Sequence, residues 1–188
     1  MNIKVIKFGG SSLTNDENLR KVTKKTIQFL QEGQKVVAIL SAQGKTTDTL
    51  LAEAKRLSKN PNKRELDMLV SVGEQISISK FAILLNEMGY KAISLTGEQA
   101  GMITNEEYTQ AKIQEIRPYR IWKELEENDA VVVAGFQGID SHRNITTLGR
   151  NGSDTSAVAI AAALNQKECY IFTDTDGIYD KDPNQYSN

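Results

Sequence analysis

The amino-acid sequence predicts an α/β fold, a three-layer α/β/α sandwich with a mostly parallel central sheet. Short runs rich in Val, Ile and Leu alternate with stretches of helical periodicity along the 188 residues. The run Lys35–Leu40 is apolar after its first residue, which is typical of a strand buried on both faces. Helices that alternate with such strands cover both sides of a parallel sheet.

The first part of the chain gives two strands and two helices, each with a recognisable boundary. We expect them in this order: a strand at Ile3–Phe8, a helix at about Asp16–Glu32 stopped by Gly33, a strand at Lys35–Leu40, and after the loop Ser41–Asp48 a helix ended by Asn60-Pro61-Asn62.

The segment Arg64–Met88 is helical in pattern and is expected to be interrupted at Gly73. Its inward-facing residues are expected to be Ile76, Ile83, Leu84 and Met88, with Gly89 as its end. The remaining expected elements are strands at Lys91–Leu95, Ala130–Ala134 and Glu168–Thr173 and a helix at Thr155–Leu164.

Composition favours one soluble globular domain with a core of its own. The chain is 39% hydrophobic and 25% charged, with a net charge of −1, which argues against a surface for nucleic acid or anionic membranes. No apolar run is judged to approach membrane-spanning length, and no signal peptide is recognised. Cys169 is expected to be a buried thiol, so a reducing, cytoplasmic setting fits. His142 is the only histidine, which argues against a transition-metal site.

Polar, glycine-containing loops follow three of the expected strands. Lys7 with Gly9-Gly10-Ser11 closes the first, Ser41-Ala42-Gln43-Gly44 the second, and 173–177 the last. In parallel sheets ligands gather outside the carboxyl ends of the strands, so these loops predict one shared site. Glycines would let backbone N–H groups approach phosphate oxygens while the lysine neutralises charge. Each loop taken singly is also compatible with a plain turn.

The stretch 146–157 reads as a glycine-rich loop that ends in a helix cap. Ser153 or Asp154 is expected to cap the helix, whose positive end suits an anionic group. Arg150 adds a planar fork that matches a carboxylate or a phosphate. The alternative is a tight turn that caps an ordinary core helix.

Two shorter patterns each have more than one interpretation. Gly44-Lys45-Thr46 is similar to the end of a P-loop, but that motif needs glycine where Ile39 stands, and no Gly-x-Gly-x-x-Gly occurs, so a P-loop is rejected. Glu74 interrupts an apolar helix within Ser71-Val72-Gly73-Glu74. It is either a surface residue or a carboxylate that holds a substrate ammonium.

Seven blocks together resemble those of the aspartate kinases, a branch of the amino-acid-kinase superfamily, in the right order. They are Lys7-Phe8-Gly9-Gly10-Ser11-Ser12, Ser41-Ala42-Gln43-Gly44-Lys45-Thr46-Thr47-Asp48, Ser71-Val72-Gly73-Glu74, Thr96-Gly97-Glu98-Gln99-Ala100-Gly101, Gly135-Phe136-Gln137-Gly138, Gly149-Arg150-Asn151-Gly152-Ser153-Asp154-Thr155-Ser156-Ala157 and Thr173-Asp174-Thr175-Asp176-Gly177-Ile178-Tyr179. The resemblance runs from Ile3 to about Pro183.

The resemblance implies ATP-dependent phosphorylation of the L-aspartate side chain to 4-phospho-L-aspartate, the entry to lysine, threonine and methionine synthesis. It assigns ATP binding to Lys7, Gly9, Gly10, Ser11, Ser41, Thr173, Asp174, Tyr179 and Asp182. It assigns substrate binding to Thr47, Glu74, Arg150, Gly152 and Ser153. Lys7 would stabilise the transferring phosphoryl group and Asp154 would organise the lysines of the site, so these two are the implied catalytic residues.

Further expectations follow from the same resemblance. Mg²⁺ would enter with ATP, without a dedicated protein metal site, and the protein would be a cytoplasmic homodimer. Lys45 and Asn151 stand where glycine is common in the family, and asparagine tolerates a left-handed backbone. The family's kinase domain continues past Asn188 with a second phosphate-binding lysine and then ACT domains, so 1–188 is expected to be an incomplete catalytic domain. The alternatives are a binding fragment without turnover and a kinase of another small acid in the superfamily.

Overall fold

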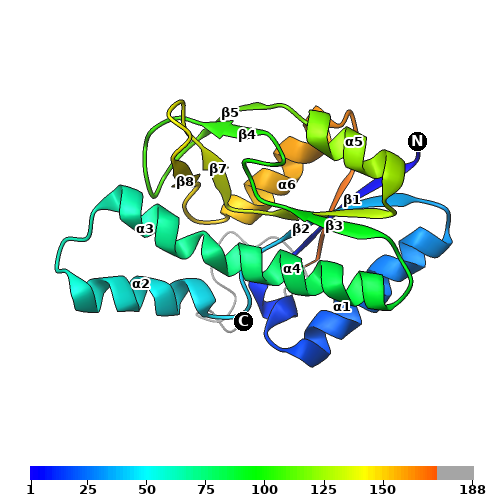
Figure 1. The fold of residues 1–188 in the computed structure, drawn as a ribbon, viewed down its shortest axis with the longest axis horizontal. Helices are drawn as coiled ribbons and strands as arrows, with labels where there is room; N and C mark the ends of the chain where they lie inside the picture. Colours follow the sequence, from blue (N-terminus) through cyan, green and yellow to red (C-terminus); the bar gives the residue numbers. More distant parts are fainter. Residues whose placement is uncertain (173–188) are drawn as a thin grey trace, which may run out of the picture.

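The computed structural model describes residues 1–172, and its centre is a parallel five-stranded sheet (Figure 1). Its strands are β1 (Ile3–Phe8), β2 (Lys35–Leu40), β3 (Ala92–Leu95), β6 (Ala130–Ala134) and β9 (Cys169–Phe172). They lie in the order β3-β6-β2-β1-β9, and every neighbouring pair is parallel. All five match strands expected from the sequence.

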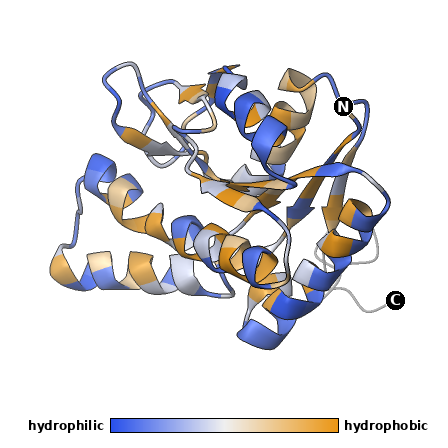
Figure 2. Ribbon diagram, turned by 45° about the vertical axis from the view of Figure 1, so that its right-hand side comes forward, coloured by the Kyte–Doolittle hydropathy of each residue, from blue (hydrophilic) through white to orange (hydrophobic). Residues whose placement is uncertain are grey.

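Two helices cover each face of this sheet, and a hydrophobic cluster fills the space beneath each pair. The helices on one face are α1 (Asp16–Gln31) and α4 (Val72–Glu87), and those on the other are α5 (Tyr119–Glu127) and α6 (Gly152–Ala163). Successive strand residues alternate between the clusters, so Val5 packs with α5 and α6 while Ile6 packs with α1 and α4. Figure 2 shows hydrophobic and hydrophilic stretches alternating along the helices. The predicted three-layer sandwich is confirmed.

A second, four-stranded sheet and helix α5 were not expected from the sequence. This sheet has the order β5-β4-β7-β8, with antiparallel pairs at both ends. Its strands are β4 (Met102–Thr104), β5 (Ile113–Ile116), β7 (Gln137–Ile139) and β8 (Ile145–Thr147). Strands of three or four residues are too short to show an alternating pattern.

Three further helices lie around the ends of the strands. They are the 3₁₀ helix η1 (Gly10–Leu13), α2 (Thr46–Leu57) and α3 (Lys63–Val70). α2 and α3 pack together and project to one side of the sheet (Figure 1). α3 meets α4 at Ser71, so the expected interruption at Gly73 is wrong by two residues.

Helix α4 also differs from expectation in the face that it buries. Ile76 and Ile83, predicted to face inward, are 48% and 66% exposed, and the buried face carries Ile78, Phe81 and Leu85. Leu84, also predicted to face inward, packs partly buried against this core. Helix α4 carries apolar residues on most of its sides, so the periodicity of its sequence does not identify the side that faces the core. Contrary to expectation, the helical segment Lys63–Glu87 is long and apolar enough to span a membrane. Half of its most apolar 18-residue stretch is buried in the fold, as in the core helix of a globular domain.

Several local expectations can be compared with the backbone. Gly33 and Gly89 follow α1 and α4 with φ of +79° and +88°, which confirms them as helix stops. Cys169 is only partly buried, contrary to the expected buried thiol, because β9 lies at the edge of the described sheet.

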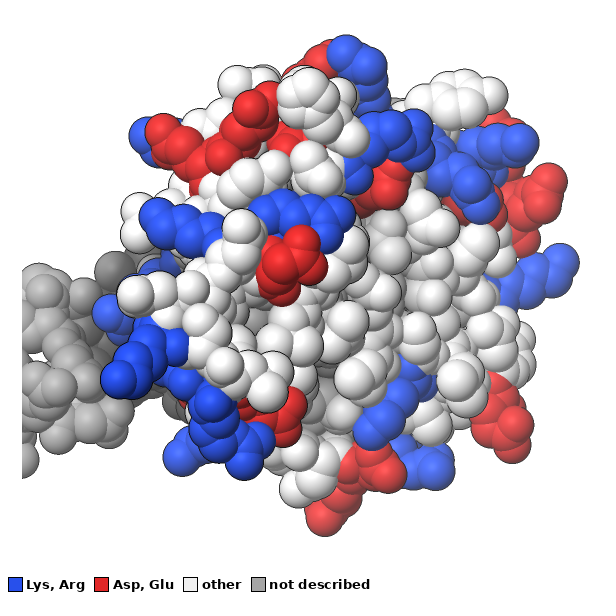
Figure 3. Space-filling view, turned by 60° about the vertical axis from the view of Figure 1, so that its left-hand side comes forward, with Lys and Arg blue, Asp and Glu red and all other residues white. Residues whose placement is uncertain are grey.

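On the side shown in Figure 3, positive and negative side chains lie interspersed around a broad uncharged area.

Candidate functional site

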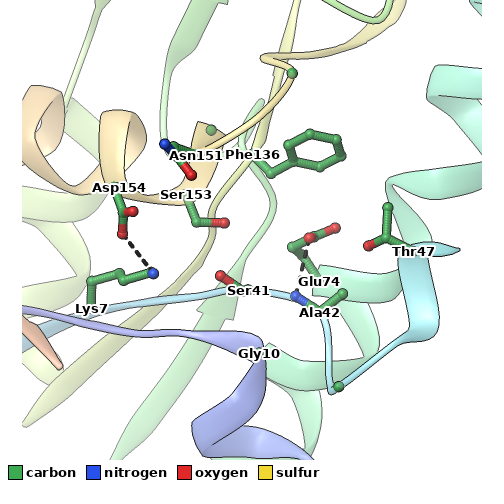
Figure 4. Close-up of a pocket in the computed structure, with 13 residues that line it drawn as sticks. Lys7, Gly10, Ser41, Ala42, Thr47, Glu74, Phe136, Asn151, Ser153 and Asp154 are labelled. Carbon is green, nitrogen blue, oxygen red and sulfur yellow. Dashed lines mark hydrogen bonds and ion pairs between the residues drawn. The ribbon is translucent and has the colours of Figure 1, made fainter. Parts of the chain in front are cut away.

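A cavity of about 290 Å³ lies at the carboxyl ends of β1 and β2 (Figure 4). Its lining comes from the end of β1, the loops after β1, β2, β6 and β8, and the helices α2, α4 and α6: Lys7, Gly10, Ser41, Ala42, Gly44, Thr47, Glu74, Phe136, Gly149, Asn151, Gly152, Ser153 and Asp154. The predicted convergence of the first two strand-end loops is therefore seen in the structure. The third loop, with Thr173, Asp174, Tyr179 and Asp182, lies outside the described residues.

Lys7 and Asp154 form an ion pair at one end of the cavity. Lys7 lies on the face of β1 that packs toward α6, and Asp154 lies in the first turn of that helix. Lys7 Nζ is 2.6 Å from Asp154 Oδ1, and Lys7 is 7% exposed (Figure 4). The carboxylate holds a buried ammonium at the cavity, where it can meet an anionic ligand.

Glu74 lies at the other end of the cavity and is 2% exposed. Its Oε1 accepts a hydrogen bond of 3.1 Å from the backbone N–H of Ala42, while Oε2 is buried without a hydrogen-bond partner among the described residues. Burial raises the pKa of Glu74 from 4.5 to about 7. A cationic ligand would satisfy Oε2 and lower this pKa, so the geometry favours the substrate-binding interpretation over a surface role.

The loops after β1 and β2 touch through their backbones, which requires glycine at Gly10. A Cβ there would lie 2.6 Å from the carbonyl oxygen of Ala42, and Gly44 N–H donates to the Gly10 carbonyl at 2.9 Å. Gly9 and Ser11, predicted with Gly10 as ATP contacts, do not line the cavity, although a Cβ at Gly9 would lie 3.4 Å from Lys7 Nζ.

Helix α6 begins earlier than expected and without the predicted cap. Gly152 is its first residue, and Ser153 and Asp154 already lie in the first turn, so neither is the N-cap. Asn151 is the N-cap, with φ of +57° and no capping bond from its side chain. The left-handed backbone expected of Asn151 is confirmed. Ser153 and Asp154 are thereby free to line the cavity at the positive end of the helix.

Arg150 does not line this cavity but a neighbouring one of about 310 Å³. The two cavities share Thr47, Phe136 and Gly149. Arg150 is exposed at the second cavity, whose other walls include Leu51 and Leu66. The structure thus separates the predicted substrate residues into Glu74, Gly152 and Ser153 on one side and Arg150 on the other, with Thr47 on both.

The sequence model of the Amino acid kinase family matches residues 2–188. The chain belongs to the amino acid kinase family. It is 51% identical over 183 residues to an aspartokinase of Geobacillus stearothermophilus, an alignment that covers 97% of this chain and 45% of that protein. The chain thus spans about half the length of the curated relatives it matches.

Solved structures of this family share the fold. Aspartate kinase from Synechocystis superposes with a TM-score of 0.81 at 47% identity, covering 98% of this chain and 30% of that one. Aspartokinase III of E. coli, solved with aspartate and ADP, superposes with a TM-score of 0.84 at 24% identity, covering 98% and 52%.

Two residues near the cavities of this amino acid kinase have no role that the sequence analysis predicts. Phe136 forms a wall of both cavities and has φ of +68°, rare for a bulky residue. It lies in a block that carried the family resemblance, which was the available signal. Asp67 is a fully buried carboxylate beneath the second cavity, and nothing in its local sequence marked it.

Proposed function

We propose that this amino acid kinase phosphorylates the side-chain carboxylate of L-aspartate with ATP, giving 4-phospho-L-aspartate and ADP. The observation that carries the proposal is the buried Oε2 of Glu74, which has no hydrogen-bond partner within residues 1–172 and lies in the same cavity as the Lys7–Asp154 pair. The Glu74 carboxylate suits the ammonium of an amino acid, and the Lys7 ammonium suits a transferring phosphate. The names of the Geobacillus and Synechocystis relatives support the same substrate.

The end of the cavity at Lys7 suits the nucleotide phosphates. Gly10 and Gly44 bring backbone groups to the cavity, and the positive end of α6 lies opposite them. Lys7 would neutralise charge on the transferring group, and Asp154 would keep its ammonium in position. Ser41 lines the cavity between Lys7 and Glu74 (Figure 4), and on this proposal it would lie near the γ-phosphate. Phosphoryl transfer depends mainly on such positioning.

The other end suits the amino acid. Glu74 would pair with the α-ammonium, and Arg150 and Thr47 would contact a carboxylate where the two cavities meet. A side-chain oxygen of aspartate then attacks the γ-phosphorus, the bond to the bridging oxygen breaks, and ADP leaves with that oxygen. The attacking carboxylate is already ionised at neutral pH, so the step needs no general base.

Mg²⁺ would accompany ATP and supply further charge neutralisation. Within residues 1–172 no group of three His, Cys, Asp or Glu side chains could hold a metal. The carboxylate of Asp154, beside the proposed phosphate position, is paired with Lys7. On this proposal the ion would be held mainly by phosphate oxygens of ATP. By resemblance to the aspartate kinases we also place the reaction at the start of lysine, threonine and methionine synthesis, in a cytoplasmic homodimer.

The test is ATP turnover with aspartate and Mg²⁺, with hydroxylamine added to trap the acyl phosphate. We expect aspartate-dependent hydroxamate from the wild-type chain, its loss in Lys7→Ala, and its retention in Lys21→Ala, which changes an exposed lysine on α1. Glutamate and other small acids replace aspartate in parallel reactions. Preference for another acid would overturn the substrate assignment. No hydroxamate, with no binding of aspartate by calorimetry, would overturn the proposal as a whole.

A further inference from the structure

Asp67 is a buried carboxylate that binds two segments distant in the sequence. It is 0% exposed and accepts hydrogen bonds from three donors. The N–H of Thr109 lies 2.9 Å from Oδ2, the N–H of Thr147 lies 2.9 Å from the same oxygen, and Thr147 Oγ1 lies 2.7 Å from Oδ1. Burial raises the pKa of Asp67 although these hydrogen bonds act in the opposite direction. Both oxygens are satisfied, so the group serves the protein rather than a ligand.

The two segments held by Asp67 bracket the loop that carries Arg150. Thr147 ends β8, three residues before Arg150. Thr109 has φ of +72°, a conformation that a β-branched residue adopts only when its surroundings enforce it. Its carbonyl oxygen would lie 3.4 Å from a Cβ at Gly149, so the Thr109 turn lies against the loop. Ala111 N–H joins the two segments by donating to the Thr147 carbonyl at 2.8 Å.

Asp67 also shares one helix face with two other buried groups that bind site elements. Ser71 follows Asp67 by four residues and Glu74 follows Ser71 by three, which places all three on one side of α3 and α4. The Ser71 carbonyl accepts a 2.7 Å bond from the Gln137 side chain on β7, and Glu74 binds Ala42 N–H after β2. One helix face therefore fixes β8, β7 and the β2 loop relative to one another.

We propose that Asp67 is a positioning residue for the substrate side of the site: it holds the Thr109 turn and the end of β8 so that Arg150 is presented to the acid substrate. The inference rests on the proposed function for its substrate. Asp67 does not line the cavity that contains Lys7. Its loss therefore affects the acid more than the nucleotide.

Asp67→Asn tests the inference because the amide replaces one acceptor by a donor, which would face the N–H and O–H donors of Thr109 and Thr147. We expect aspartate affinity to fall on the order of tenfold, by analogy with metal sites, where loss of the groups that orient the ligands costs about 10–100-fold in affinity. ATP affinity should change less than about twofold. Glu65→Gln, an exposed carboxylate on the same helix, is the matched control.

A second pair of variants keeps the test decisive if Asp67→Asn folds poorly. Thr147→Val removes only the hydroxyl donor at nearly constant shape, and Thr147→Ser restores it. The expected order of aspartate affinity is wild type, then Thr147→Ser, then Thr147→Val, at unchanged ATP affinity. Equal losses for aspartate and ATP in Thr147→Val, or no loss for either, would show that the hydrogen bonds only stabilise the fold.

Hydrogen exchange gives a readout that does not depend on the proposed function. In Asp67→Asn, or in Thr147→Val if the first variant does not fold, amides around Thr109 and residues 147–151 should exchange faster than in the wild type. Those of β1 and β2 should stay unchanged. Uniform acceleration or none would overturn the positioning role. Failure of the wild-type chain to bind aspartate would instead count against the proposed function, while the exchange result still decides the role of Asp67.

Discussion

Glu74→Gln should make the stability of this amino acid kinase less dependent on pH. In the folded protein burial raises the pKa of Glu74 from 4.5 to about 7. At about 1.36 kcal/mol per pH unit, the ionised carboxylate destabilises the folded state by ~3 kcal/mol. The folded-state pKa is above the unfolded value. The contribution of the protonated Glu74 carboxyl to the free energy of unfolding is therefore fully present below about pH 4.5. It is lost as the pH rises toward 7, and it changes no further above that.

The magnitude follows from the surroundings of the carboxylate. Ala42 N–H is its hydrogen-bond donor among the described residues, and Oε2 has none. The amide introduced by Glu74→Gln would keep its oxygen available to that donor and carry no charge. The variant should therefore match the wild type below about pH 4.5 and become progressively more stable than it above that, by up to ~3 kcal/mol at pH 8, after subtraction of any constant difference.

Urea denaturation at half-unit steps from pH 5 to 8 measures the difference, with Glu65→Gln as the exposed control. Adding aspartate should flatten the wild-type curve, because an ammonium beside Glu74 removes the cost of ionising it. A stability difference between wild type and Glu74→Gln that stays constant across this range would refute the reasoning.

Two further substitutions test the loops of the site by chemical denaturation. Gly10→Ala should lower the free energy of unfolding by about 1–3 kcal/mol, because its Cβ would lie 2.6 Å from the Ala42 carbonyl oxygen. Gly9→Ala, with 3.4 Å of space, should cost clearly less, and equal losses would contradict the close approach. At Asn151, with φ of +57°, glycine should be tolerated, whereas valine should cost about 1–2 kcal/mol. Equal stability of the two variants would contradict the left-handed backbone.

The central sheet and the meeting of two strand-end loops could be predicted because both depend on local pattern. Lys35–Leu40 is apolar after its first residue, and parallel strands bring their carboxyl ends to one edge. The predicted cap at Ser153 and Asp154 was wrong because Asn151 adopts a left-handed backbone and lets the helix begin before them.

Other features of the site depend on contacts that no local pattern records. The partners of Asp67 lie 42 and 80 residues away, so its burial and its role exist only in the folded chain. Helix α4 carries apolar residues on most sides, so its sequence does not show that Ile83 is exposed, and only the positions of α1 and the sheet select the buried face. The separation of Arg150 from the cavity of Lys7 is likewise set by tertiary structure.

Phe136 explains how the two cavities remain distinct while sharing a wall. Its positive φ costs on the order of 1–2 kcal/mol, which the surrounding contacts offset. Its N–H donates to Ser156 Oγ at 3.0 Å, and its carbonyl accepts from Leu148 N–H at 2.9 Å, so α6 and the segment before Arg150 both fix it. A Cβ at Gly152 would lie 2.8 Å from the Phe136 ring, so only glycine lets the ring pack on the start of α6. On the proposed function, a shift of the Phe136 ring changes the nucleotide side and the acid side together.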